Sequence, residues 1–345
     1  MRPTRLTSKV SAAFLLCIFA ATVHAIEPIP KESGFSGFVN AGAAYLDVEN
    51  NMIAGNDLGD VGKDTIDSIF DSPDSESDVI PVLNAELRYT FASTRTQLFV
   101  GNRLEDFLRF DLATLAGVKQ ELPDESILSV AYVFSALPTE VWADPYVERF
   151  PRQETDRNSR GVRITYDRIL GTKLQLEYTY RNIDIDDERS GQTQLVPGGF
   201  LTPSETSLLD REGNRHDVEV LYVFDIGEKH TLVPAFDYLR DDLDGGAMSA
   251  DRYRFQITHR YGGERFIFVT NLEYRHSDYD DRNPIYNKTQ DGDRYGGTFT
   301  AFYRRLFGVD GLSLTATVLA LKEDSNIDFY ESQVVGGTLS VFYRF

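Results

Sequence analysis

Charged side chains recur at alternate positions through much of this chain, each flanked by apolar or aromatic residues. The clearest case is residues 173–183, where Glu177 and Arg181 alternate with Leu176, Tyr178 and Tyr180. Because successive side chains of a β-strand point to opposite faces, this spacing places ionisable groups on one face and apolar groups on the other. Arginines and carboxylates on one face can form cross-strand ion pairs or a field that attracts polar solutes.

The ionisable residues with this spacing are our candidate functional residues: Glu86, Arg88, Arg109, Asp111, Arg163, Asp167, Glu177, Arg181, Asp217, Glu219, Arg252, Arg254, Glu273, Arg275 and Arg344. An isolated charge in a dry interior is very unfavourable, so an interior lined by them must be hydrated or tightly paired. The pattern predicts either an aqueous passage or a ladder of ion pairs that only stabilises the wall. The mixed signs give no clear ion preference, although Arg252, Arg254, Arg275 and Arg344 on the late strands point to an anion-attracting patch.

Histidines beside hydroxyls or carboxylates could instead support hydrolysis. His276 precedes Ser277 and Asp278, and His216 precedes Asp217. Adjacent residues of a strand point to opposite faces, so these neighbours make poor catalytic dyads. The sequence also contains no Gly-x-Ser-x-Gly pattern, phosphate-binding loop or Cys/His metal spacing. We therefore predict no catalytic residues, and a hydrolase is the least favoured alternative.

Acidic segments are the remaining candidates for metal chemistry. Residues 49–78 carry many carboxylates against the single cation Lys63, and 242–245 and 291–293 hold closely spaced aspartates. None matches a calcium loop, which needs ligands at alternate positions and a terminal Glu. We expect residues 49–78 to form a solvated, self-repelling loop, and we predict no metal site and no cofactor.

The elements that position these residues are predicted to be about fourteen strands. The lengths of these strands are close to the roughly 9–11 residues that a tilted transmembrane strand needs. They are expected at 34–48, 79–91, 95–103, 107–116, 126–137, 160–169, 173–183, 215–224, 230–239, 251–261, 265–277, 295–307, 312–321 and 336–345. About twelve strands is the alternative, if the pair joined at 104–106 is misassigned.

The connections between these strands largely alternate in length. Tight turns at 92–94, 170–172, 262–264 and 308–311 alternate with long polar loops such as 138–159 and 184–214, while 117–125 reads as a further turn. Short periplasmic turns and long extracellular loops are typical of outer-membrane barrels. The long loops hold Trp142, Tyr146, Tyr279 and Tyr286, which could fold inward as a constriction or outward as a binding surface.

The amino terminus has the order of a secretory signal peptide. Arg2, Arg5 and Lys9 precede an apolar run at 12–21, which is shorter than the roughly 20 residues of a membrane helix, and residues 23–25 offer a cleavage site. We expect residues 1–25 to be removed and 26–345 to form one barrel domain. Cys17, the single cysteine, lies in the removed segment, and a lipid anchor there is disfavoured because Leu16 precedes it.

The charge and composition narrow the class of protein. The formal net charge is -19, and removal of the three basic residues of the signal makes it -19 - 3 = -22, which argues against a nucleic-acid partner. Tyr and Phe occur 18 and 23 times, as suits strands and membrane interfaces. No later stretch is apolar enough for a membrane helix, so a spanning structure must be a closed barrel.

The last strand ends on an aromatic residue, with Leu339, Val341, Tyr343 and Phe345 on one face. This strand and the run at 26–38, IEPIPKESGFSGF, resemble a family of uncharacterised bacterial outer-membrane β-barrel proteins. The resemblance implies the barrel fold, the bacterial outer membrane as location, and an assembly signal in these four residues that the barrel assembly machinery reads. It carries no catalytic or binding residues.

We therefore expect an all-β chain folded as a transmembrane antiparallel up-and-down β-barrel with both termini in the periplasm. The expected function is a porin-like passive channel for small hydrophilic solutes that contacts outer-membrane lipid and lipopolysaccharide and has no enzymatic activity. A receptor or structural barrel with a closed lumen is the alternative. The sequence does not identify the solute.

Overall fold

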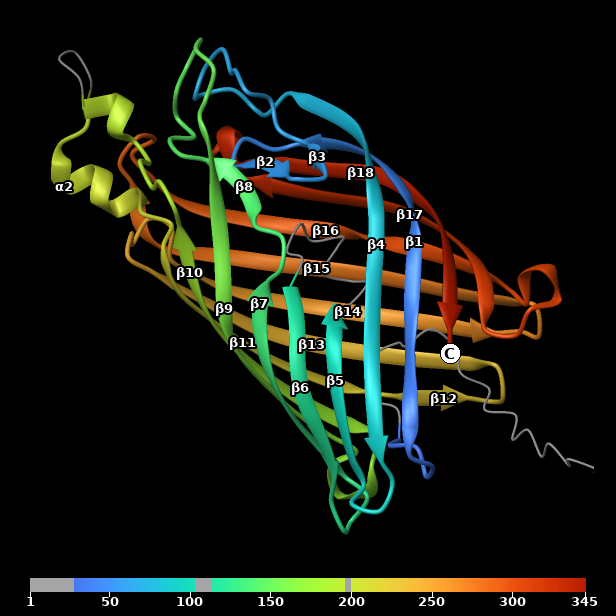
Figure 1. The fold of residues 1–345 in the computed structure, drawn as a ribbon. Helices are drawn as coiled ribbons and strands as arrows, with labels where there is room; N and C mark the ends of the chain where they lie inside the picture. The colour runs from blue at the N-terminus through green and yellow to red at the C-terminus, as the bar shows by residue number, and fades with distance from the viewer. Residues whose placement is uncertain (1–27, 103–112, 196–199) are drawn as a thin grey trace, which may run out of the picture.

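A computed structural model describes residues 28–102, 113–195 and 200–345. Within these residues fourteen long strands form a closed antiparallel barrel (Figure 1). The strands are β1 (Gly34–Glu49), β4 (Ser75–Phe91), β5 (Thr96–Asn102), β6 (Ala113–Glu121), β7 (Ile127–Ser135), β9 (Glu154–Asp167), β10 (Leu174–Ile185), β11 (Gly213–Tyr222), β13 (His230–Leu243), β14 (Ala250–Gly262), β15 (Phe266–Asn283), β16 (Lys288–Arg304), β17 (Leu312–Ser325) and β18 (Ser332–Arg344). The predicted fold class and strand number are confirmed.

The barrel closes because β1 pairs with both the second and the last of these strands. Tyr45 lies opposite Val79 of β4 on one side and opposite Gly337 of β18 on the other. Each remaining long strand pairs with its neighbours in sequence, which makes the topology up-and-down. Shorter elements are β12 (Phe224–Ile226), which continues the β11 hairpin, β2 (Ile53–Asn56), β3 (Gly59–Asp60), β8 (Thr139–Trp142) and the one-turn helix α2 (Pro203–Thr206).

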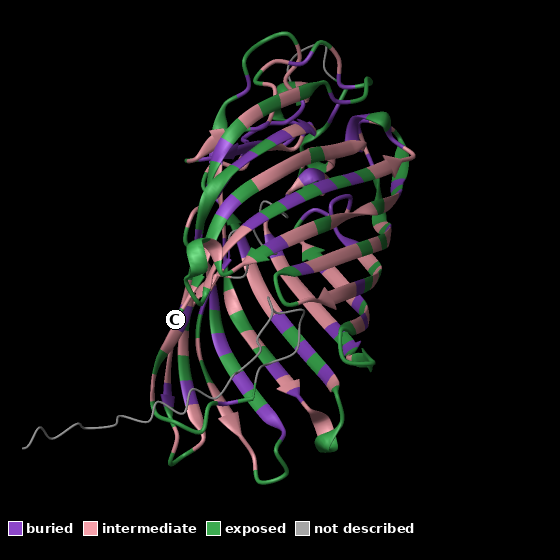
Figure 2. Cartoon of the chain, turned by 90° about the vertical axis from the view of Figure 1, so that its right-hand side faces the viewer, coloured by how far each residue is buried: buried purple, intermediate pink, exposed green. Residues whose placement is uncertain are grey.

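The apolar face of the strands points outward. On β4, Val79 and Leu83 are 63% and 64% exposed, whereas Ile80, Val82 and Asn84 between and beside them are buried. Figure 2 shows the same alternation as bands of exposed and buried residues along the strands. A soluble monomer rarely exposes an apolar surface of this extent, so the outer surface matches an apolar environment. No helix in the described residues is long and apolar enough to cross a membrane.

Short connections gather at one end of the barrel. They join β4 to β5, β6 to β7, β9 to β10, β12 to β13, β14 to β15 and β16 to β17. The end of β18 lies there too, since the backbone of Phe345 exchanges hydrogen bonds of 3.0 and 3.1 Å with that of Gly37 near the start of β1. At the opposite end the connections after β1, β7 and β10 are long, as predicted. Those after β13, β15 and β17 are only six, four and six residues long, because these strands extend further than expected.

Three expectations need correction. Residues 117–121 belong to β6 rather than to a turn, and the strand expected at 107–116 is described only from Ala113. Gly117 reads as a turn residue, but a Cβ there would lie 2.4 Å from the Val130 carbonyl oxygen, so the glycine permits close pairing with β7. Residues 278–283 and 288–294, expected in a loop, extend β15 and β16 beyond the apolar band. The predicted signal peptide lies outside the described residues.

The third correction concerns residues 49–78, which form a folded segment rather than a solvated loop. They contain β2, β3 and the start of β4, and Val61, Ile66 and Ile69 are buried. The carboxylates Asp57, Asp60, Asp64, Asp67, Asp71 and Asp74 are exposed, as expected. The apolar residues between the carboxylates fold this segment, and the charges remain at its surface.

Candidate functional site

The candidate ionisable residues lie on the inward face of the barrel strands. On β14, for example, Arg252 and Arg254 alternate with the exposed aromatic residues Tyr253 and Phe255. The same alternation places the following predicted residues inward: Glu86, Arg88, Arg163, Asp167, Glu177, Arg181, Asp217, Glu219, Glu273, Arg275 and Arg344. Arg109 and Asp111 lie outside the described residues.

On the wall formed by β9 and β10, opposite charges meet across the strands. Arg163 Nε lies 3.1 Å from Glu177 Oε1 and donates a hydrogen bond of 2.9 Å to Thr179. The hydroxyl of Thr165 donates to the other oxygen of Glu177 at 2.9 Å. The carboxylate of Glu177 is thus held by both a charge and a hydroxyl. On β4, Arg88 contacts Glu86 two residues away on the same face.

A second set of ion pairs runs across β11 to β17. Arg254 Nε donates to Asp237 Oδ2 at 3.0 Å, and its Nη2 lies 3.7 Å from Glu219 Oε2. Arg215 donates to both oxygens of Asp241 at 2.5 and 3.1 Å, and Arg252 contacts the same carboxylate. Around the barrel from there, Arg275 pairs with Glu323 at 2.8 Å and Glu273 with Arg294 at 3.4 Å.

These pairs form a cross-strand ladder on the inner wall, one of the two arrangements expected from the sequence. Sequence reasoning missed several partners that complete it: Arg215, Asp237, Asp241, Arg294 and Glu323. Asp241 and Glu323 lie beyond the expected ends of their strands at 239 and 321. Asp237 was missed because its inward neighbours Val233, Ala235 and Leu239 are apolar, so alternation of polarity is absent there.

The long connections fold together into a second structure, which we call the loop cap. Its buried apolar core consists of Ile66, Ile69, Tyr146, Leu201, Leu209, Ala247, Met248, Ile285, Ile327, Phe329 and Tyr330. These residues come from the connections before β4, β9, β11, β14, β16 and β18. Tyr146 and Phe329 are both fully buried, with their ring centroids 5.3 Å apart.

Contacts in the loop cap link connections from distant parts of the rim. The Tyr146 hydroxyl, between β8 and β9, lies 2.6 Å from the Tyr330 hydroxyl, between β17 and β18. In the closed barrel these two connections leave from nearly opposite sides. Asn283 donates to the Tyr330 hydroxyl at 2.8 Å, and the Tyr286 hydroxyl donates to the carbonyl of Ile69 at 2.9 Å. The loop cap therefore spans the mouth of the barrel.

A buried arginine anchors the connection that carries Trp142. The Arg152 guanidinium lies 4.2 Å from the centre of the Trp142 ring and donates to the carbonyls of Asn51, at 2.8 Å, and of Lys63. Burial lowers the pKa of Arg152 to about 10. Next to it, β2 pairs with β8, which joins two connections of the cap. Trp142, Tyr146 and Tyr286 thus fold inward, one of the two placements that the sequence left open.

The tyrosines make the loop cap sensitive to alkali. Burial raises the pKa of Tyr146, Tyr286 and Tyr330, so the folded cap holds them neutral, whereas exposed tyrosines ionise near pH 10. Their contribution to the stability of the cap is therefore fully present below about pH 10 and is lost as the pH rises further. We expect the emission of Trp142 to shift to the red above about pH 10, measured by fluorescence titration.

The double variant Tyr146→Phe/Tyr330→Phe is the control for this titration, because it removes two of the ionising groups and keeps the rings. Its emission is expected to shift at a higher pH than that of the parent. An identical onset in the two proteins would show that the titrating groups lie elsewhere.

Among the described residues, no group of three or more His, Cys, Asp or Glu side chains is placed to hold a metal.

The four residues of the expected assembly signal lie on the outer face of β18. Leu339, Val341, Tyr343 and Phe345 are all exposed, between 42% and 58%. Phe342, the aromatic residue on the other face, instead stacks on Phe38 inside the barrel at a centroid distance of 5.3 Å. The exposed row is thus accessible to another protein along the outside of the barrel.

Comparison with solved structures finds weak similarities that extend over most of the chain. An anion-selective porin from Comamonas acidovorans is 9% identical, with 91% of this chain and 100% of that chain covered and a TM-score of 0.41. A loop-deletion mutant of OmpT, an outer membrane protein of Vibrio cholerae, is 9% identical, with 90% and 99% covered and a TM-score of 0.40. A Pseudomonas aeruginosa FadL homologue is 11% identical, with 90% of each chain covered and a TM-score of 0.40.

At these TM-scores the similarities carry no assignment. No protein of curated function matches the chain in sequence. The resemblance seen in the sequence is nevertheless confirmed at the level of the family, because a family model covers the barrel from β1 to β18. That model, described as a protein of unknown function (DUF2860), matches residues 34–344, and the chain belongs to this family.

Proposed function

We propose that the protein is an outer-membrane channel that passively conducts small hydrophilic solutes through a charged lumen whose outer mouth is narrowed by the loop cap. The observation that carries the proposal is the charged inward face of a fourteen-stranded barrel. An eight-stranded barrel is filled by its own side chains, and additional strands widen the interior. Charged side chains on the inner wall favour water in that extra space.

The outer surface supports the proposed location. Exposed apolar residues on the barrel strands match a hydrocarbon layer, and a closed barrel leaves no strand edge without a hydrogen-bonding partner in lipid. In the proposed orientation the short connections and Phe345 face the periplasm, and the loop cap faces outward. The signal peptide expected at 1–25 would direct export, and the outer ends of the strands would contact lipopolysaccharide.

Transport in this proposal is diffusion and requires no cofactor or energy source. The cross-strand pairs place both signs of charge along the wall, so a solute meets alternating donors and acceptors rather than a field of one sign. The loop cap restricts the route to the lumen to gaps around its apolar core. A narrow route of this kind predicts a small unit conductance.

Planar-bilayer recording of the refolded protein tests the proposal. We expect discrete steps of small, uniform conductance that persist at moderate voltage in either direction. Bilayers that stay silent with folded protein present would contradict a channel. The same recording under a salt gradient measures ion preference. A weak preference is expected, because Arg252, Arg254 and Arg275 are each paired with a carboxylate.

The loop cap also favours a second candidate, a closed barrel whose outer surface acts as a receptor. The specific observation is the Tyr146–Tyr330 contact across the mouth at 2.6 Å. A receptor barrel would remain silent in bilayers even after the core of the cap is weakened. A channel would instead conduct more strongly when the cap is weakened, so one variant of the cap distinguishes the two functions.

We further propose that the outward row ending at Phe345 is recognised by the barrel assembly machinery. The variant Phe345→Ala keeps the backbone hydrogen bonds with Gly37 and is expected to refold normally into lipid vesicles, yet to reach the outer membrane in severalfold lower amount in cells. Folded protein in isolated membranes is measured by its resistance to SDS at low temperature. Phe307→Ala, at an aromatic residue 90% exposed in a short connection, is the control.

Impaired refolding of Phe345→Ala in vesicles would mean that the residue stabilises the barrel itself. Normal amounts in the membrane would show that assembly does not depend on the terminal ring.

A further inference from the structure

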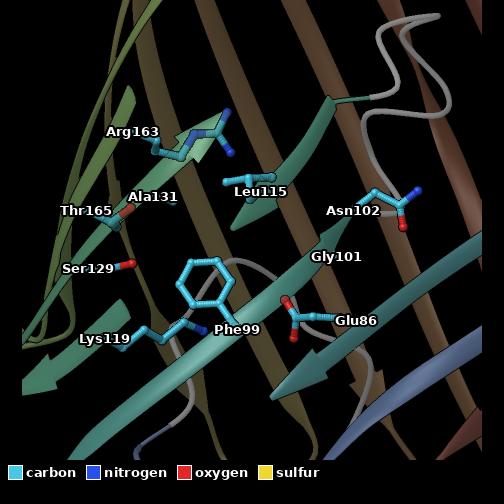
Figure 3. Close-up of a pocket in the computed structure, with 10 residues that line it drawn as sticks. All are labelled: Glu86, Phe99, Gly101, Asn102, Leu115, Lys119, Ser129, Ala131, Arg163 and Thr165. Carbon is cyan, nitrogen blue, oxygen red and sulfur yellow. The ribbon is translucent and has the colours of Figure 1, made fainter. Parts of the chain in front are cut away.

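A hollow opens in the inner wall where β4, β5, β6, β7 and β9 lie side by side (Figure 3). Its cavity volume is about 50 Å³, and it opens to the lumen, so a ligand held there would lie partly in the lumen. Small residues, Gly101, Ser129 and Ala131, line its base. Long side chains surround them, among which Glu86, Lys119 and Arg163 carry charge. The hollow exists because small and long inward residues alternate on this part of the wall.

One side of the hollow is apolar. Phe99 and Leu115 line it and pack with a buried cluster that includes Val133. Lys119 Nζ lies 4.8 Å from the centre of the Phe99 ring, within range of a cation–π interaction. In Figure 3 the Phe99 ring lies between Lys119 and Glu86. A ligand in the hollow would therefore find an aromatic surface with charges beside it.

The charges of opposite sign lie on different strands of this wall. Glu86 is on β4 opposite Gly101 of β5, and Arg163 is on β9 opposite Ala131 of β7. Strands β5, β6 and β7 separate them, and Lys119 is on β6, the middle one. The hollow thus has a carboxylate at one edge, a guanidinium at the other and an ammonium group between. Glu86 also contacts Arg88, and Arg163 also contacts Glu177, so a ligand would add to these pairs rather than meet isolated charges.

One donor in the hollow is unsatisfied by the protein. Arg163 uses its Nε for Glu177 and Thr179, while its Nη1 is buried and has no hydrogen-bond partner among the described residues. A buried donor without an acceptor is destabilising. A carboxylate in the hollow would supply that acceptor together with a negative charge.

We propose that this hollow binds a small zwitterion with an apolar body, the chemistry of an apolar amino acid. The ligand carboxylate would lie at Arg163 and Lys119, its ammonium group at Glu86, and its apolar body on Phe99 and Leu115. A simple anion in the hollow would place a negative group near the Glu86 carboxylate. A simple cation would lie near two positive side chains, Lys119 and Arg163. The zwitterion satisfies both edges of the hollow.

The inference deepens the proposed function, because it names the class of solute that the channel would select, and its role in transport rests on that function. Binding itself does not require transport. We would therefore measure binding by calorimetry on the refolded full barrel in detergent, with phenylalanine as the probe, and measure conductance separately in bilayers.

Three probes separate the two charges of the ligand. N-acetylphenylalanine keeps the carboxylate and lacks the ammonium group, while phenylalaninamide keeps the ammonium group and lacks the carboxylate. We expect phenylalanine to bind at least about tenfold more tightly than either, because each charge-assisted hydrogen bond contributes roughly that factor or more. Glycine, which lacks the apolar body, is expected to bind weakly.

Two variants test the position of the site. Lys119→Met keeps the aliphatic stem and is expected to weaken binding of phenylalanine and N-acetylphenylalanine about tenfold, with little effect on phenylalaninamide. Ala131→Leu fills the base of the hollow and is expected to abolish binding of all three probes. Ala116→Leu, on the exposed outer face of β6, is the matched control and is expected to bind as the parent does.

The outcomes distinguish this inference from the channel. Equal affinity for phenylalanine and N-acetylphenylalanine would overturn the zwitterion in favour of an anion site. Absence of binding in a protein that conducts would overturn the site and leave the channel. Binding with the expected specificity in a protein that never conducts would support the site and overturn the channel.

Discussion

Replacing Phe329 by alanine is expected to raise the unit conductance and the open time of the channel in planar bilayers. Phe329 is fully buried at the centre of the loop cap, where its ring lies 5.2 to 6.0 Å from those of Tyr146, Tyr286 and Tyr330. Truncating a buried phenylalanine destabilises its surroundings by about 3–5 kcal/mol. The loss is expected to fall on the cap, because the ring of Phe329 contacts three tyrosines of the cap.

Phe70→Ala is the matched control for this variant. Phe70 belongs to the same cap and touches Tyr286 edge-on at 5.9 Å, but it is 57% exposed. Its truncation is expected to change conductance little, since most of the ring already lies in solvent. Protease digestion of intact vesicles provides a second measurement, in which cleavage in the long connections increases for Phe329→Ala only. If neither variant produces any conductance in planar bilayers, the receptor barrel is favoured over the channel.

The barrel itself could be predicted from the sequence because alternation is a local signal. In residues 173–183 polar and apolar side chains alternate. Because successive side chains of a strand point to opposite faces, this alternation defines an inner and an outer face directly. The inward placement of Glu177 and Arg181 follows from spacing alone. Around Val233 and Ala235 on β13 the inner face is itself apolar, so the polarity does not alternate there. For this reason Asp237, the ion-pair partner of Arg254, was missed.

The loop cap could not be predicted because its contacts join residues far apart in the chain. Tyr146 and Tyr330 are 184 residues apart, and neither lies in a repeating pattern. The apolar residues between the carboxylates of 49–78, such as Ile66 and Ile69, were the available signal, since a solvated loop has no need of them. Their partners depend on which connections meet above the mouth, and that follows only from the closed barrel.

Replacing Asp241 by asparagine is expected to lower the free energy of unfolding by about 3–5 kcal/mol, measured by denaturant titration in detergent or lipid vesicles. The Asp241 side chain is 1% exposed and is the shared partner of Arg215 and Arg252. Its loss removes the carboxylate that the two guanidinium groups share and leaves their mutual repulsion without that compensation. A buried charge that loses its partner is far more destabilising than the net value of the pair suggests.

The next residue in the chain supplies the control. Asp242 has a side chain that is 65% exposed and lies 3.7 Å from Arg240, and Asp242→Asn is expected to change stability by about 0–1 kcal/mol, as for other surface pairs. The comparison also reports on the lumen. If Asp241→Asn is as mild as Asp242→Asn, water reaches this part of the ladder and screens the arginines. If it is severe, the double variant Asp241→Asn/Arg252→Met is expected to recover stability by removing the repulsion between the two arginines, which would show that the wall is locally dry and that solutes pass elsewhere in the barrel.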